Sequence, residues 1–195
     1  MAGRAGVDPA NRLYATGRER RDTMGARVLV SYASQFGATQ AIAETIGAAL
    51  REAGAEVDVR LVLDVNDLSG YQAVIVGSPI YNGQWLPEAI YFVQHYEATL
   101  RQMPVAYFVV SMTMREDTPE HRQRVLEYLA MVREAAPTIE PVDIGLFAGK
   151  LDYHNLPLLD RVLFWLRERL PSGDFRNWNV VRTWVERVRP ELTKN

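Results

Sequence analysis

The stretch VLVSYASQFGATQAIAETIGAAL, residues 28–50, contains three successive patterns. Residues 28–32 are mostly apolar, which is typical of a β-strand covered on both faces. Small and hydroxyl-bearing residues follow at 34–39. Apolar residues then recur at helical spacing up to Gly54, and glycine is a common residue at the end of a helix. A strand, a glycine-containing loop and a helix in this order predict the first unit of a parallel α/β sheet.

The rest of the chain repeats this alternation. Strands are expected at 28–32, 56–61, 73–77, 105–111 and 142–147, and further helices at 87–100, 119–135, 157–170 and 177–188. The first, third and fourth strands are continuously apolar and belong in the centre, whereas the second and fifth alternate with polar residues and belong at the edges. With right-handed crossovers, this predicts a three-layer sandwich with a five-stranded parallel sheet of order 2-1-3-4-5 and an added helical segment after strand five.

Composition limits the classes of function. With 195 residues, of which 48% are hydrophobic, the chain is expected to form one domain over residues 25–195, after a disordered tail at 1–24. The formal net charge of −2 argues against a nucleic-acid partner. Cysteine is absent, which excludes disulfides and thiolate metal sites, and the three histidines lack metal-ligand spacing. No stretch has the length and apolarity of a membrane span.

The loop at 34–39 indicates a phosphate site. Its residues are Ser34, Gln35, Phe36, Gly37, Ala38 and Thr39. They supply hydroxyls and a glycine directly before a helix, whose first N–H groups favour an anion. A simpler interpretation is that Ser34 and Thr39 only cap the helix. The glycine patterns of dinucleotide and triphosphate sites are absent, and lysine occurs only at 150 and 194. A monophosphate held by amides and hydroxyls therefore fits better than a triphosphate.

The same loop resembles the FMN-phosphate loop of flavodoxins, in which a hydroxyl residue, any residue, a hydroxyl residue, glycine, any residue and threonine follow one another. Ser34, Gly37 and Thr39 match, and Phe36 stands where a hydroxyl residue is expected. The resemblance implies a flavodoxin-like fold with FMN as cofactor. It also implies that the flavin ring lies against the loops after strands three and four.

Two groups of residues are expected at the ring on this resemblance. They are Pro79, Ile80, Tyr81, Asn82 and Gly83 after strand three, and Ser111, Met112, Thr113 and Met114 after strand four. Tyr81 would line the ring, and the peptide between Asn82 and Gly83 would face its N5 atom. The alternatives are a plain Asn-Gly turn and methionines that only fill the core.

Residues 27–189 resemble more closely the flavodoxin-domain family that contains the menaquinone-dependent protoporphyrinogen IX dehydrogenase. The shared features are the phosphate loop, the FAGxLxY run at 147–153 and the tryptophan-bearing last helix. This resemblance implies an FMN-dependent oxidoreductase with a small-molecule or quinone electron partner. An electron-carrying flavodoxin is the alternative, although such carriers are usually strongly acidic.

The amphipathic segment 156–170 has several possible roles. It could contact a membrane surface peripherally, pair with a second subunit in a homodimer, or pack on its own sheet. Together these features predict a cytoplasmic protein that could act at the inner face of the membrane.

Overall fold

The computed structural model describes residues 26–151 and 172–194. The expected tail at 1–24, the helix at 157–170 and the amphipathic segment 156–170 lie outside the described residues.

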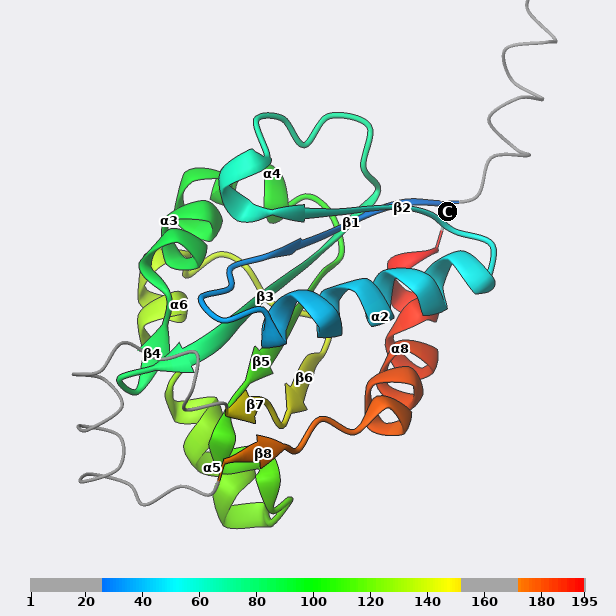
Figure 1. Ribbon diagram of the computed structural model, residues 1–195. Coiled ribbons are helices and arrows are strands. Elements are labelled where there is room, and N and C mark those ends of the chain that lie inside the picture. The colour runs from blue at the N-terminus through cyan, green and yellow to red at the C-terminus, as the bar shows by residue number, and fades with distance from the viewer. Residues whose placement is uncertain (1–25, 152–171, 195) are drawn as a thin grey trace, which may run out of the picture.

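Five parallel strands form the central sheet (Figure 1). In spatial order they are β2 (Glu56–Leu61), β1 (Arg27–Tyr32), β3 (Ala73–Tyr81), β5 (Val105–Val110) and β6 (Ile144–Phe147). This order confirms the expected arrangement, with the second and fifth strands of the parallel set at the edges. The short strand β4 (Gln84–Trp85) was not expected and pairs antiparallel with the end of β3.

Helices cover both faces of this sheet and give the three-layer sandwich (Figure 1). One face carries α2 (Ala38–Glu52) and α8 (Trp178–Leu192). The other carries α3 (Pro87–His95), α4 (Glu97–Leu100), α5 (Pro119–Glu127) and α6 (Ala130–Ala135). The single helices expected at 87–100 and 119–135 are thus each two helices. The first break falls at Tyr96, whose hydroxyl donates to the Val65 carbonyl at 3.1 Å.

Two apolar layers lie on either side of the sheet because successive strand residues face opposite ways. In β1, Val28 and Val30 face α2 and α8, whereas Leu29 faces the other helices. The last three residues of β6 are buried, although the alternating pattern predicted a face open to water. Trp184 of α8 packs against Phe147 at 5.6 Å between ring centroids and covers it, whereas Leu146 packs in the core on the other face.

The end of α2 forms a regular glycine cap. Gly54 has a φ of 93°, and its N–H donates to the Arg51 carbonyl at 2.9 Å. The N–H of Ala55 donates to the Leu50 carbonyl at 3.1 Å, which completes a Schellman motif. The glycine expected to end this helix does so, and the chain turns directly into edge strand β2.

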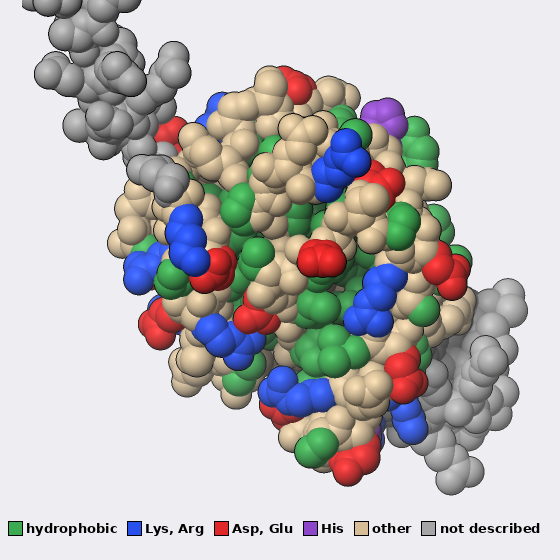
Figure 2. Space-filling view, turned by 180° about the vertical axis from the view of Figure 1, so that it is seen from behind, with side chains coloured by type: hydrophobic (Ala, Val, Ile, Leu, Met, Phe, Trp, Pro, Cys, Tyr) green, Lys and Arg blue, Asp and Glu red, His purple; other side chains and the backbone are tan. Residues whose placement is uncertain are grey.

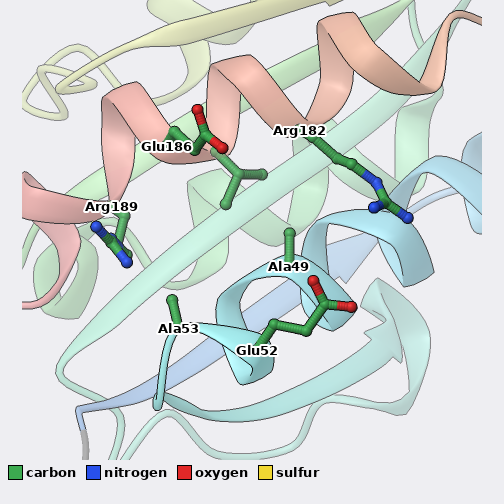
Figure 3. A pocket seen from close by; sticks show the side chains of 7 residues that line it. Ala49, Glu52, Ala53, Arg182, Glu186 and Arg189 are labelled. Carbon is green, nitrogen blue, oxygen red and sulfur yellow. The ribbon is translucent and has the colours of Figure 1, made fainter.

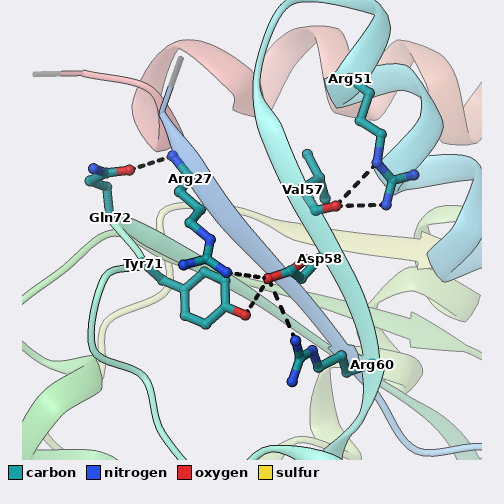
Figure 4. Close-up of polar contacts among 7 residues, drawn as sticks. All are labelled: Arg27, Arg51, Val57, Asp58, Arg60, Tyr71 and Gln72. Carbon is teal, nitrogen blue, oxygen red and sulfur yellow. Dashed lines mark hydrogen bonds and ion pairs between the residues drawn. The ribbon is translucent and has the colours of Figure 1, made fainter. Parts of the chain in front are cut away.

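A polar cluster centred on Asp58 joins β1 and β2 (Figure 4). Asp58 accepts hydrogen bonds from the Tyr71 hydroxyl at 2.5 Å and from the Arg27 guanidinium at 2.9 Å. Arg60 lies 3.9 Å from the same carboxylate. The Tyr71 hydrogen bond is the largest cause that lowers the pKa of Asp58 from its ordinary value of 3.8, and the arginines act in the same direction. The cluster therefore stabilises the folded chain most strongly while Asp58 is ionised.

Replacing Asp58 with Asn should lower the free energy of unfolding at pH 7 by about 1 kcal/mol, because charge-assisted bonds become neutral ones. Since the pKa of Asp58 is lowered on folding, its contribution is complete above the ordinary value of 3.8 and disappears as the pH falls through the folded pKa. Urea unfolding at pH 7 and pH 3 measures this, with Glu52→Gln as an exposed control. An equal difference between wild type and Asp58→Asn at both pH values would contradict the assignment.

Candidate functional site

The N-terminus of α2 is open toward the carboxyl ends of the strands. Gly37 is the N-cap with a φ of 78°, no side chain caps the helix, and its first turn has no acidic residue. The Ser34 hydroxyl instead accepts a hydrogen bond from the Gly37 N–H at 3.1 Å, inside the loop. Neither Ser34 nor Thr39 therefore caps the helix through a side-chain hydrogen bond. Thr39 lies in the first helical turn and is 1% exposed. Uncapped first-turn amides and a helix dipole make this end a suitable anion site.

Strand β3 continues four residues further than the sequence predicted. Ser78 is buried, and its hydroxyl accepts a hydrogen bond from the Leu86 N–H at 3.0 Å, which ties β3 to the returning chain. Tyr81 pairs with Gln84 across a two-residue turn in which Asn82 and Gly83 have φ values of 51° and 78°. Two successive positive φ values define a type I′ hairpin. The expected Asn-Gly turn is present, at the tip of a hairpin rather than in an open loop.

The segment after β5 separates the two methionines. Ser111 caps the short helix η2 (Met112–Arg115). Its hydroxyl accepts a hydrogen bond from the Thr113 N–H at 3.2 Å. The Met114 N–H donates to the Ser111 carbonyl at 3.1 Å. The Met114 side chain packs in the core below the sheet face that carries α5, whereas Met112 lines the candidate site. Met114 is therefore a core residue, and of the two methionines only Met112 is placed to contact a ligand in the cavity.

The segment after β6 was not predicted to take part. Here β7 (Lys150–Leu151) pairs antiparallel with β8 (Gly173–Asp174), which forms a small ribbon beside the ends of β5 and β6. A Cβ placed on Gly149 would lie 3.2 Å from Val110, so the ribbon approaches the end of β5 closely. The FAGxLxY run was visible in the sequence, but nothing in its spacing reveals where the ribbon folds.

These four segments meet around a cavity of about 100 Å³. Eight expected residues line it, namely Gln35, Phe36, Ala38, Thr39, Pro79, Ile80, Tyr81 and Met112, together with Val110, Gly149, Lys150 and Leu151, which were not expected. The other expected residues, Ser34, Gly37, Asn82, Gly83, Ser111, Thr113 and Met114, lie in the same segments but not on its wall. The cavity lies where the direction of winding reverses, between β1 and β3, which is the usual ligand position in such sheets.

The donors and apolar groups of this cavity suit FMN. Uncapped amides and Thr39 can take a phosphate, and Ile80, Tyr81 and Met112 supply apolar and polarizable contact for a ring. The cavity is smaller than the 300 Å³ or so of a typical small-molecule pocket, so a flavin would fill it and protrude at its rim. Phe36, 47% exposed, forms part of that rim.

A second cleft of about 280 Å³ lies between α2 and α8 (Figure 3). Glu52, Glu186, Arg182 and Arg189 are the charged residues that line it. It sits at the C-terminal end of α2, so it lies about 16 Å along the helix from the first-turn amides. Charges of both signs and the absence of helix N-terminal donors make it a poor phosphate site, despite its larger volume.

The parallel sheet, the open helix N-terminus and the adjoining apolar cavity define an α/β domain of the mononucleotide-binding class. The chain belongs to the flavodoxin domain family, which matches residues 29–176. FMN is the cofactor that this domain indicates, in agreement with the expectation from residues 34–39. Within residues 26–151 and 172–194, no helix combines the length and apolarity needed to cross a membrane.

Curated relatives carry the name protoporphyrinogen IX dehydrogenase [quinone]. The protein of Leishmania major is 26% identical over 173 residues, covering 82% of this chain and 73% of its own. The protein of Escherichia coli K12 is 25% identical over 164 residues, covering 82% of this chain and 90% of its own. The alignments therefore span most of both chains at low identity.

Solved flavodoxins share the fold. A short-chain flavodoxin associated with a PDU bacterial microcompartment gives a TM-score of 0.54 at 10% identity, covering 83% of this chain and 95% of its own. A single-site mutant of a flavodoxin from Pseudomonas aeruginosa gives a TM-score of 0.52 at 12% identity, covering 86% and 99%. At these identities the likeness supports the fold alone.

Proposed function

We propose that this chain is an FMN-dependent oxidoreductase that delivers electrons to a quinone. The observation that carries the proposal is the junction of the uncapped N-terminus of α2 with a cavity walled by Ile80, Tyr81 and Met112. Bound FMN would supply hydride and electron transfer at its ring, which the side chains of this site cannot perform themselves.

The protein's own groups would bind and orient the cofactor. The first-turn amides of α2 and the Thr39 hydroxyl would hold the phosphate, and the helix dipole would favour its charge. Tyr81 and Met112 would hold the ring and keep water from one side of it. Of the described residues that line the cavity, only Tyr81 and Lys150 have titratable side chains, so most proton exchange would occur with solvent or substrate.

Surface charge favours an enzyme over an acidic electron carrier. The chain has 22 basic and 24 acidic residues. Figure 2 shows basic and acidic side chains interspersed over one face, rather than a field of a single sign. Carriers use such a field to steer a protein partner, whereas a small neutral quinone needs none.

Cofactor binding is the first test of this proposal. Titration of FMN with the purified chain should quench flavin fluorescence at a 1:1 ratio, and denaturation should release the FMN. A sample that leaves FMN fluorescence unchanged would overturn the proposal.

The substrate forms the finer part of the proposal. The names of the relatives at 25–26% identity support protoporphyrinogen IX as the donor and a quinone as the acceptor. The FMN-loaded chain, mixed anaerobically with protoporphyrinogen IX and menadione, should produce porphyrin fluorescence faster than the same mixture without protein. FMN binding without this turnover would favour the alternative of an electron-carrying flavodoxin.

A further inference from the structure

Lys150 is the only charged side chain among the described residues that line the cavity. The sequence has lysine at just two positions, and neither lies near the phosphate loop along the chain. The fold nevertheless brings Lys150 to the lining of the same cavity as Gln35 and Thr39. A positive charge therefore stands at a site that the sequence predicted to rely on amides and hydroxyls alone.

No carboxylate within the described residues neutralises this charge by an ion pair. Asp174 pairs with Lys150 in the register of the β7–β8 ribbon, and the Lys150 charge is one of the smaller causes that lower the pKa of Asp174. The hydrogen bonds to its carboxylate come from Arg176, whose Nε donates to Oδ1 at 2.8 Å and whose second nitrogen donates to Oδ2, so Lys150 has no hydrogen-bonded ion pair with Asp174. Lys150 is exposed, so its ammonium can move on a flexible stem toward a ligand in the cavity.

Its place in the sheet separates Lys150 from the phosphate end of the site. The phosphate loop follows β1 and Lys150 follows β6, and three steps of about 4.8 Å separate these strands in the order β1-β3-β5-β6. Lys150 follows Gly149, which lies close to β5 and to η2. A Cβ placed on Gly149 would lie 3.2 Å from Val110 and 3.8 Å from the Met112 sulfur. Lys150 therefore lies beside the wall assigned to the ring.

We propose that Lys150 stabilises the negative charge that the flavin ring gains on reduction, and so raises the midpoint potential of bound FMN. A ring that takes up two electrons and one proton carries one negative charge, shared between N1 and O2. A nearby ammonium attracts this charge and has little effect on the neutral oxidised ring. The proposal rests on the proposed function, because it requires FMN in this cavity.

The test variant is Lys150→Met, which removes the charge and keeps a side chain of similar length. Lys150→Arg retains the charge. Lys194→Met removes a lysine elsewhere in the chain and is the control. Lys194 follows the last helix and pairs with Glu191 at 2.7 Å, so it should not affect the cavity. The measurements are the midpoint potential of bound FMN at pH 7 against a reference dye and the affinity for oxidised FMN.

Lys150→Met should bind reduced FMN three- to tenfold more weakly relative to oxidised FMN, which lowers the potential by about 15 to 30 mV for a two-electron couple. Lys150→Arg and Lys194→Met should keep the wild-type potential. An unchanged potential in Lys150→Met would overturn the inference. If Lys150→Met kept the wild-type potential but no longer preferred FMN to riboflavin, the result would also overturn the inference. It would show that Lys150 contacts the phosphate and not the ring. If the wild type bound no FMN, the proposed function itself would fail, which is a distinguishable result.

Discussion

Thr39→Val should lower the affinity for FMN ten- to a hundredfold and leave the affinity for riboflavin unchanged. Thr39 is 1% exposed, lines the cavity and lies in the first turn of α2. A hydrogen bond to a charged group contributes about 1.5–3 kcal/mol, and riboflavin lacks the phosphate that would accept it. Valine keeps the shape and a similar helix propensity, so the helix should form as before. Fluorescence titration with each flavin measures both affinities.

Thr45→Val is the matched control for this experiment, since it makes the same change in the same helix. The Thr45 hydroxyl donates to the Ala41 carbonyl at 2.8 Å and does not line the cavity. Its variant should bind both flavins like the wild type. If Thr39→Val lost the same affinity for FMN and for riboflavin, the Thr39 hydroxyl would not bind the phosphate.

Gly77→Ala should lower the free energy of unfolding by about 3 kcal/mol. A Cβ at this position would lie 1.9 Å from the ring of Phe108, the neighbouring residue on β5. Phe108 is fully buried and packs against Phe147 at 6.3 Å between ring centroids, so it has little room to move. The gain of about 0.4–1 kcal/mol from a stiffer unfolded chain is too small to offset this clash. Urea unfolding measures the difference.

The double variant Gly77→Ala, Phe108→Leu separates the clash from other effects of alanine. A smaller side chain at 108 leaves space for the new methyl group, so the two changes should cost less together than the sum of the single variants. Strictly additive losses would show that Phe108 is not the source of the destabilisation.

The sheet order could be predicted because burial is encoded in strand composition. VLV, AVIV and VAYFVV must be covered on both faces, and this requirement fixes the three central strands. The position of the phosphate loop follows from the same local pattern. Strand ends were harder to predict, because residues 78–81 extend β3 by pairing with β5 and with the short strand β4, and no periodicity encodes this pairing.

The site was predicted in its local parts and missed where distant segments meet. Residues 34–39 and 79–81 follow strands that the sequence reveals, so their neighbourhood could be expected. Lys150 reaches the cavity through the β7–β8 ribbon, whose two strands are far apart along the chain. The short helix η2 directs the side chains of Met112 and Met114 to different places, and the amino-acid sequence does not reveal this difference.

The most direct test of the central claim is the structure of the chain crystallised with FMN. The phosphate is expected at the first-turn amides of α2, beside Thr39, with the ring against Tyr81 and Met112. FMN bound in the cleft between α2 and α8, or a phosphate held away from the α2 N-terminus, would contradict it.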